Sequence, residues 1–595
     1  MLRGLGRDCR ADGGGQIVLG DRMVLATVDI VIILGFMALT LVVGLIVRRR
    51  GSSDSAGYFL GNRQMPWWLL GLSMVATTFS TDTPNLVTDI VRTQGVSGNW
   101  AWWSFLLTGM LTTFVFARLW RRLGVTTDIE FYEKRYSGSA ASFLRGFRAV
   151  YLGVFFNVMI MGLVTLAAIK IGGVMLGVSP LTVVLVAGIV TVVFCATSGF
   201  IGVVITDVIL FVTAMAGAFL AAWFALDHPA VGGLSGLFSN EVVRASRDVF
   251  PDFSDPSAWI PLLLVPLAVQ WWAVWYPGSE PGGGGYVAQR MLAARDEQHA
   301  VGAVAFFNLA HYALRPWPWI IVALASLIVY PDLDSLRTAL PQVDPGIVGH
   351  DLAYPAMLSL LPAGVLGFVV ASLVSAYIST VSSHLNWGAS YVVNDVYVRF
   401  ARPDSSAKEQ VFVARLTTVV LMLMAAIVAL ALENAFQAFR LVLTIGAGTG
   451  LLFILRWFWK RINAWSEISA MVFSFAISIA MEWWAPDGMD PWKIFLFSVL
   501  LTTVGWVLVT LLTPPEKPQV LESFEASIRP EGDNGTKFRR EVRAGVLLAL
   551  SAAVAVYGLL FGTGAVLYGE PTKAIAWLIL ALLFGTITIG KWRNQ

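Results

Sequence analysis

Five serine or threonine hydroxyls lie within the ten residues SAYISTVSSH (375–384), inside an otherwise apolar run. Residues three or four apart share one face of a helix. The polar ridge that this spacing predicts contains Ala376, Ser379, Thr380 and Ser383, with Ser375 and Ser382 along its edge. An isolated serine in such a helix usually bonds its own backbone or lets helices pack closely. A continuous ridge instead favours a site for a hard monovalent cation, which takes hydroxyl and carbonyl oxygens.

Two aspartates also lie in apolar surroundings. Asp207 stands in a long apolar run, where ionisable groups are rare and usually paired or functional, although it could simply lie near the cytoplasmic entry of its helix. Asp82 lies in the polar cluster TTFSTDTP (77–84), where it could bind a polyol or an ammonium group, or cap the helix that follows. Arg315, in LRPWPW, is expected to be a structural cation for a carboxylate or carbonyl network.

The elements that position these residues must be membrane helices. Of 595 residues, 57% are hydrophobic and only 13% are charged, which excludes an ordinary soluble domain. A span needs roughly 20 apolar residues, and by this measure the sequence predicts fifteen helices, centred near 36, 78, 108, 160, 187, 212, 267, 315, 375, 422, 446, 473, 503, 556 and 580.

Basic residues gather in alternate loops of this prediction. If the first helix enters from outside, the cytoplasmic segments are 48–63, 118–138, 288–299, 398–410, 456–463, 514–543 and the tail. They contain nearly all the loop Lys and Arg, as the positive-inside rule requires. We therefore expect a multi-pass protein of the cell inner (plasma) membrane, with its amino terminus outside and its carboxyl terminus cytoplasmic.

The predicted organisation has four parts. Residues 1–22 are expected to be disordered or to follow a mis-assigned start, and 24–48 form a leading peripheral helix. A ten-helix core covers 60–458, and 463–595 hold four peripheral helices with a cytoplasmic loop at 513–543.

Two of the predicted helices are interrupted. The second, at 65–91, contains the TTFSTDTP cluster, and the seventh, at 261–290, contains PGSEPGGGG, which cannot continue a regular helix. Irregular backbone at membrane depth is tolerated where it lines a cavity or is packed in protein. Because the two breaks stand five helices apart, they occupy corresponding positions of two five-helix blocks, the arrangement typical of a transporter binding site.

Several stretches carry a resemblance to a known family. They are YFLGNRQMPWWLLGLSMVATTFS (58–80), ATSGFIGVVITDVI (196–209), YVAQRMLAA (286–294), the SAYISTVSSHL ridge with NDVY (394–397), and GTGLLFILRWFWKRINAWSEISAM (448–471). The chain resembles the sodium/solute symporter family of sodium/proline, sodium/galactose, sodium/sialic acid and sodium/glucose carriers, over about 50–480. The resemblance implies an all-α integral membrane protein of about 15 transmembrane helices, with a 5+5 inverted-repeat core of the leucine-transporter fold and broken first and sixth core helices.

The resemblance also implies sites for the coupling ion. The main sodium site would use the carbonyls of Ala76, Phe79 and Ala376 and the hydroxyls of Ser379 and Thr380. Some members have a second sodium site, and the matching positions here are Asp207, Ser379, Ser382 and Ser383, so that one or two sodium ions per cycle remain open.

The solute cavity is less well defined by the sequence. Candidates at the first break are Thr78, Asp82 and Thr83, and aromatic candidates near the two breaks are Trp103, Trp275 and Tyr276. The aromatic side chains could stack on a solute or could be packing and interface residues. The solute could be a sugar, an amino acid or a sugar acid.

The resulting prediction is a sodium-coupled symporter that imports a small organic solute by alternating access. Na⁺ is the expected coupling ion, with no organic cofactor, and the expected partners are the solute and the lipid bilayer, without nucleic acid. We expect a functional monomer and no enzymatic activity. The alternatives are a proton-coupled symporter of the same fold, with Asp207 carrying the coupling, and a transport-related membrane sensor.

Overall fold

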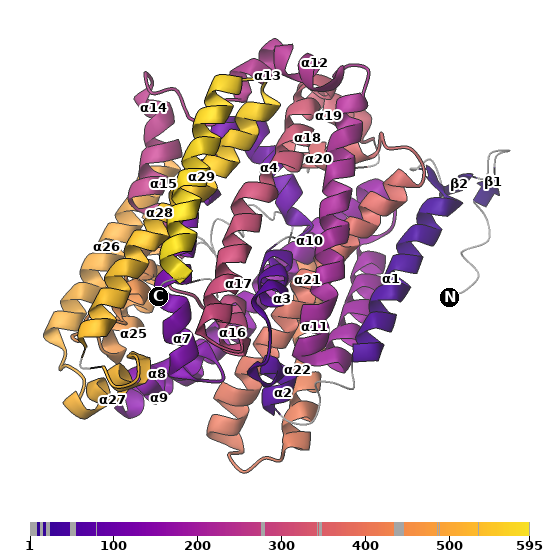
Figure 1. Cartoon of the computed structure of the whole chain (residues 1–595). Coiled ribbons are helices and arrows are strands. Elements are labelled where there is room, and N and C mark those ends of the chain that lie inside the picture. Colours follow the sequence, from indigo (N-terminus) through magenta and orange to yellow (C-terminus); the bar gives the residue numbers. More distant parts are fainter. Residues whose placement is uncertain are drawn as a thin grey trace.

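The computed structural model describes residues 9–11, 16–19, 24–47, 55–78, 80–274, 280–341, 343, 348–432, 446–484, 486, 488–533 and 535–593. Most of them are helical (Figure 1). Three short strands, β1 (Cys9–Ala11), β2 (Gln16–Leu19) and β3 (Val24–Ala26), form an antiparallel sheet next to the first helix. In this sheet β2 pairs with β3, with Gln16 opposite Ala26 and Val18 opposite Val24, and the expectation of disorder or a mis-assigned start over 1–22 stays a prediction.

The first half of the chain supplies α1 to α11. In chain order they are α1 (Thr27–Val47), α2 (Ser55–Leu60), α3 (Trp67–Thr77), α4 (Asp82–Gln94), α5 (Trp100–Trp103), α6 (Leu106–Leu111), α7 (Ala117–Leu123), α8 (Phe131–Arg135), α9 (Gly138–Val150), α10 (Asn157–Leu176) and α11 (Pro180–Asp227). Two π-helical turns, Thr112–Phe116 and Tyr151–Phe156, join α6 to α7 and α9 to α10 without a loop.

The rest of the chain begins with short helices and ends in a long helical pair. In chain order they are α12 (Gly233–Ser239), α13 (Glu241–Ser246), α14 (Pro256–Trp259), α15 (Val265–Ala268), α16 (Gly285–Ala293), α17 (Glu297–Leu309), α18 (Pro316–Val329), α19 (Leu333–Ala339), α20 (Ala353–Leu358), α21 (Val365–Tyr391), α22 (Ala407–Ala431), α24 (Gly450–Leu455), α25 (Ala464–Trp484), α26 (Pro491–Leu512), α27 (Pro518–Ile528), α28 (Thr536–Leu567) and α29 (Pro571–Arg593).

Eleven helices in the described part of the chain are long and apolar enough to cross a membrane. The segments Trp67–Thr77 and Pro180–Ala196 are shorter apolar helices. The chain is therefore a multi-pass membrane protein, as predicted. The count of fifteen spans stays a prediction, and the first half of the span expected near 446 lies outside the described residues, which leave out 433–445.

The helix α11 covers two of the predicted spans. Its 48 residues would measure about 72 Å as one straight helix, more than twice the roughly 30 Å of a hydrocarbon core. The helix is interrupted at Gly199, whose φ of 58° is open to glycine and strained for other residues. A Cβ at this position would also meet the Tyr58 ring at 3.1 Å. Glycine here therefore permits both the break and the close packing.

Both predicted interruptions are present. The helix α3 ends at Thr77 and α4 begins at Asp82, so the break falls within the TTFSTDTP cluster. Hydroxyls compete with the main chain here, because Thr77 Oγ1 donates to Ser73 O at 2.8 Å and Thr78 Oγ1 donates to Met74 O at 3.0 Å. The second break separates α15, which ends at Ala268, from α16, which begins at Gly285.

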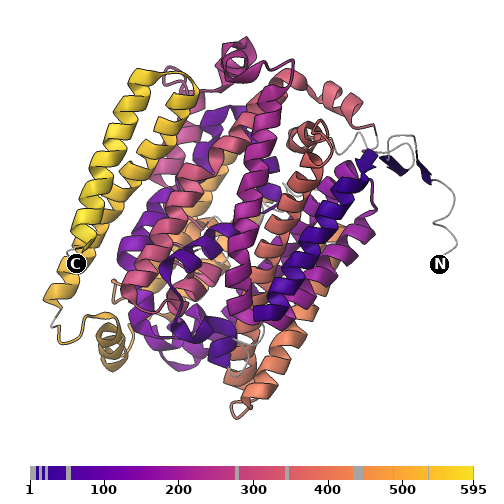
Figure 2. The ribbon, with the colours of Figure 1, turned by 45° about the vertical axis from the view of Figure 1, so that its right-hand side comes forward.

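The broken helix α3 lies in the centre of the molecule, packed against α11, α17 and α21. Figures 1 and 2 show α1 along one flank and the yellow pair α28 and α29 along the opposite flank. The polar side chains Ser73 and Thr77 of α3 are therefore buried between helices.

The predicted cytoplasmic segments meet at one end of the helical bundle. In Figure 1 this end carries α2, α8, α9 and α27, whereas α12, α13 and α19 lie at the other end. Arg122 forms ion pairs with Glu297 and Glu541, at 2.7 Å each, and Arg399 forms an ion pair with Glu133 at 2.9 Å. These ion pairs tie segments from four of the predicted cytoplasmic loops together, so the loops lie on the same side of the protein.

Candidate ion and solute sites at the broken helix

The carboxyl end of α3 leaves main-chain carbonyls without partners in its own helix, as every helix end does. Arg315, at the start of α18, supplies donors to them. Its Nη1 donates to Val75 O at 3.0 Å and its Nη2 donates to Thr78 O at 3.1 Å. The positive charge of Arg315 is also stabilised by the negative, carboxyl-terminal end of the α3 helix dipole. The expected role of Arg315 in a carbonyl network is confirmed.

The hydroxyl ridge of α21 faces α3. Ser379 and Thr380 are 1% and 3% exposed, so neither side chain is turned toward lipid. Thr380 Oγ1 donates to Thr77 O at 2.8 Å, and Thr77 Oγ1 lies 2.9 Å from Ser383 Oγ. The helical spacing of the ridge therefore points its oxygens at the last turn of the broken helix.

Asp207 on α11 is fully buried and is also held by this ridge. Its Oδ1 accepts from Ser379 Oγ at 2.6 Å, and its Oδ2 accepts from Ser73 Oγ of α3 at 2.5 Å. Ser382 Oγ lies at the same level of α21 and donates to Ser379 O at 3.2 Å. One carboxylate and several hydroxyls thus meet where α3, α11 and α21 converge.

The two predicted ion-site sets occupy neighbouring positions. In the main set, Ala76 lies in the last turn of α3, which Thr380 of α21 contacts at Thr77 O, whereas Phe79 lies outside the described residues. Ala376 and Ser379 lie on α21 within one turn of Thr380. The hydroxyl of Ser379 points at Asp207, while that of Thr380 points at the end of α3. The chemistry available is a cluster of carbonyl and hydroxyl oxygens beside one carboxylate, which suits alkali-metal ions.

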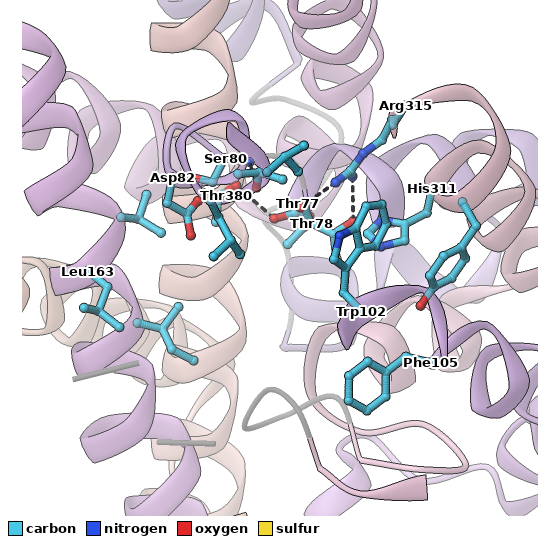
Figure 3. Close-up of a pocket in the computed structure, with 16 residues that line it drawn as sticks. Thr77, Thr78, Ser80, Asp82, Trp102, Phe105, Leu163, His311, Arg315 and Thr380 are labelled. Carbon is cyan, nitrogen blue, oxygen red and sulfur yellow. Dashed lines mark hydrogen bonds between the residues drawn. The ribbon is translucent and has the colours of Figure 1, made fainter. Parts of the chain in front are cut away.

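A cavity opens next to the break. Of the predicted solute residues, Thr78, Asp82 and Thr83 line it, together with Thr77 and with Thr380 of the candidate ion site. Figure 3 shows Asp82 and Thr380 on one side of the cavity and Trp102, His311 and Arg315 on the other. The cavity therefore combines a carboxylate and hydroxyls on the broken helix with an aromatic wall opposite.

Comparison with known proteins identifies the family of the chain. The family model described as "Sodium:solute symporter family" matches residues 58–473. The chain belongs to the sodium:solute symporter family. The coupling ion of this symporter is therefore sodium.

The alignments with its relatives cover most of this chain and nearly all of each relative. The symporter is 27% identical to a sodium/glucose cotransporter of Vibrio parahaemolyticus, over 82% of this chain and 91% of the relative. It is 23% identical to the sodium/sialic acid symporter SiaT of Proteus mirabilis, over 84% of this chain and 98% of the relative. A solved Na⁺-coupled sialic acid symporter shares its fold, with a TM-score of 0.65 at 20% identity, covering 83% of this chain and 99% of the other.

Asp82 was predicted to line the cavity or to cap α4. The N-cap residue of α4 is Thr81, which makes no side-chain cap bond, and Asp82 follows it in the first turn. At this position the positive end of the α4 helix dipole stabilises its carboxylate. Asp82 also lines the cavity of the symporter from the first turn of α4, and both the solute-binding and the capping alternatives stay open.

Among the aromatic candidates, Trp103 takes the packing alternative. Its ring is fully buried and packs against Trp100 and Phe561, with centroids 5.9 and 6.1 Å apart, and Tyr557 Oη donates to its carbonyl. Its neighbour Trp102 lines the cavity instead. The reason is that α28 covers the other face of α5. Trp275 and Tyr276 lie outside the described residues.

Several residues at the two candidate sites were not predicted from the sequence. Tyr312 stacks on Trp102 with centroids 5.9 Å apart, His311 lies edge-on to the same ring, and both line the cavity. They stand on the π-helical turn Ala310–Leu314, and such turns are frequent at functional sites. Arg290 joins the Asp207 cluster from α16. An arginine in an apolar segment next to a helix break was the available signal for it.

Proposed function

We propose that this symporter binds sodium between the end of α3 and the hydroxyl ridge of α21, and imports a small organic solute held in the adjoining cavity. The observation that carries the proposal is the 2.8 Å contact of Thr380 Oγ1 with Thr77 O, because both residues also line the cavity. An ion at this contact would touch the wall of the solute space. Its proposed ligands are the carbonyls of Ala76, Phe79 and Ala376 and the hydroxyls of Ser379 and Thr380.

Coupling follows from this shared wall. Sodium would hold the end of α3 against α21 and complete the cavity, so ion and solute would favour the same state. Each then raises the affinity of the other by the same factor. On the cytoplasmic side, low sodium and the membrane potential, about 2.3 kcal/mol per charge per 100 mV, would drive release. The direction of alternating access is set by the gradient.

The cavity supports a compact polar solute with an apolar face. Asp82, Thr78 and Thr83 would accept or exchange hydrogen bonds with hydroxyl or ammonium groups, and Trp102 and Tyr312 would pack on the apolar side of the solute. The relatives are named for glucose and for sialic acid. We therefore propose a sugar, a sugar acid or an amino acid.

The proposed topology has the amino terminus outside and the carboxyl terminus in the cytoplasm, in the cell inner membrane. The ion-paired basic segments at one end of the bundle support it, since positive loops stay cytoplasmic. A ten-helix core at 60–458, built as two inverted five-helix repeats, would carry transport. The helices after 463 would be peripheral, and the functional unit would be a monomer.

A thermal-shift screen of the purified protein against a metabolite panel tests the proposal. Each compound is measured in sodium and in choline at equal ionic strength. The expected result is a stabilising solute whose effect requires sodium and weakens when Asp82 is replaced by asparagine. A solute that stabilises the protein equally in choline would overturn the coupling between the two sites.

A further inference from the structure

Arg290, in α16 directly after the second helix break, carries a fully buried guanidinium. Its Nη2 lies 3.9 Å from Asp207 Oδ2 and donates to Ser383 Oγ at 2.6 Å. Its Nε and Nη2 each donate to Ser73 Oγ at 3.2 Å, and Ser73 Oγ donates to Asp207 Oδ2. The guanidinium and the carboxylate thus share one hydroxyl and form a buried ion pair.

This ion pair occupies the predicted second sodium set. Of its four members, Asp207 is paired with Arg290, Ser383 accepts a hydrogen bond from the same guanidinium, and Ser379 donates to Asp207. A sodium ion among these oxygens would stand next to the guanidinium. Two positive charges beside one carboxylate would leave a net charge in an apolar interior, which is costly.

We infer that Arg290 is a tethered cation that competes with sodium for Asp207, so that the symporter binds a single sodium ion while Arg290 keeps this position. The inference rests on the proposed main site at Thr380, which would hold the one sodium. Arg290 is then a positioning residue: it sets how many ions are coupled without contacting the solute.

The surroundings of Arg290 suit this role. An arginine keeps its charge in nearly any environment, and its planar fork binds several acceptors at once. Nη1 donates to Gln289 Oε1 at 3.0 Å, and the guanidinium lies over the rings of Phe200 and Tyr286, 5.5 and 5.8 Å from their centroids. Gln289 in turn donates to Asn386 Oδ1 at 3.0 Å. The charge is therefore anchored beside Asp207 by contacts on three sides.

The competition links four elements of the fold. Arg290 belongs to α16, whereas its partners Ser73, Asp207 and Ser383 belong to α3, α11 and α21. A sodium ion that displaced the guanidinium would take over the charge of Asp207 and would break the contacts that Arg290 makes with the other three helices. Binding of a second sodium ion would therefore change the contacts of α16, the helix that follows the second break.

The test counts sodium ions on the full-length purified protein by equilibrium binding of radioactive sodium, with thermal unfolding in sodium and in choline as a second readout. The variants are Arg290→Gln, Arg290→Lys and the double variant Asp207→Asn/Arg290→Gln. We expect one ion in the wild type and in Arg290→Lys, which keeps the charge. Two ions are expected in Arg290→Gln, together with a steeper dependence of its unfolding temperature on sodium. The double variant should return to one ion and lose the steeper dependence.

Two bound ions in the wild type would overturn the inference without any variant, as would a single ion in folded Arg290→Gln. Failure of the proposed main site looks different. In that case Thr380→Val would bind as many ions as the wild type with unchanged affinity, whatever the Arg290 variants do.

Discussion

Replacing Thr380 by valine removes the hydroxyl at the proposed main sodium site and keeps the side-chain shape. In the ion-free state the protein loses the 2.8 Å hydrogen bond to Thr77 O, and a neutral hydrogen bond contributes about 0.5–1.5 kcal/mol. In the ion-bound state it loses an oxygen that faces a full charge, for which the contribution is about 1.5–3 kcal/mol. The difference is about 1–1.5 kcal/mol, so the half-saturating sodium concentration should rise roughly 5- to 12-fold, at 1.4 kcal/mol per factor of ten.

The measurement is a sodium titration of the unfolding temperature of the purified protein, with choline holding the ionic strength constant. Thr418→Val is the matched control, because Thr418 is equally buried but its Oγ1 donates to Ala414 O in its own helix α22. The control should leave the titration unchanged. A Thr380→Val protein that folds and keeps a half-saturating concentration within twofold of the wild type would refute the proposed ligand set.

Three further predictions follow from the cavity and the cytoplasmic end. Asp82→Asn should weaken solute binding at least fivefold and leave the sodium titration of the solute-free protein unchanged; equal loss of both would instead indicate damage to the break. Trp102→Ala should abolish solute binding with little loss of stability, whereas Trp103→Ala should mainly lower the unfolding temperature, and the reverse order would contradict the assigned faces. Burial raises the pKa of Glu133, but hydrogen bonds led by that from Arg399 outweigh it and lower the pKa to about 2. The ionised Glu133 therefore stabilises the protein above the ordinary glutamate pKa of about 4.3, and this stabilisation is lost as pH falls from there toward 2. Glu133→Gln should flatten the decline of the unfolding temperature in that range.

Much of the fold could be predicted because membrane helices depend on long apolar runs, which the sequence displays directly. The break at 78–81 was also accessible, since hydroxyls and a proline interrupt one such run. The orientation of the α21 ridge followed from helical spacing alone. Ser379 and Thr380 lie on a face that was expected to pack against polar groups. Ser379 donates to Asp207, which also accepts from Ser73, and Thr380 donates to Thr77 O.

Other features depend on contacts between distant segments. Trp102 and Trp103 differ by one residue and both lie in an apolar stretch, so only the packing of Phe561 from α28 decides which ring is covered. The π-helical turn at 310–314 sets which face His311 and Tyr312 present, and its extra residue per turn leaves no clear mark in the sequence. Arg290 and Ser73 are 217 residues apart, so their meeting at Asp207 required the folded chain.

The most direct test of the central claim is a high-resolution structure of the purified protein determined in sodium. The account predicts a spherical density bonded to Ala76 O and Thr380 Oγ1, with the hydrogen bond from Thr380 to Thr77 O opened by the ion. Density for sodium elsewhere, with the Thr380–Thr77 bond still closed, would contradict it.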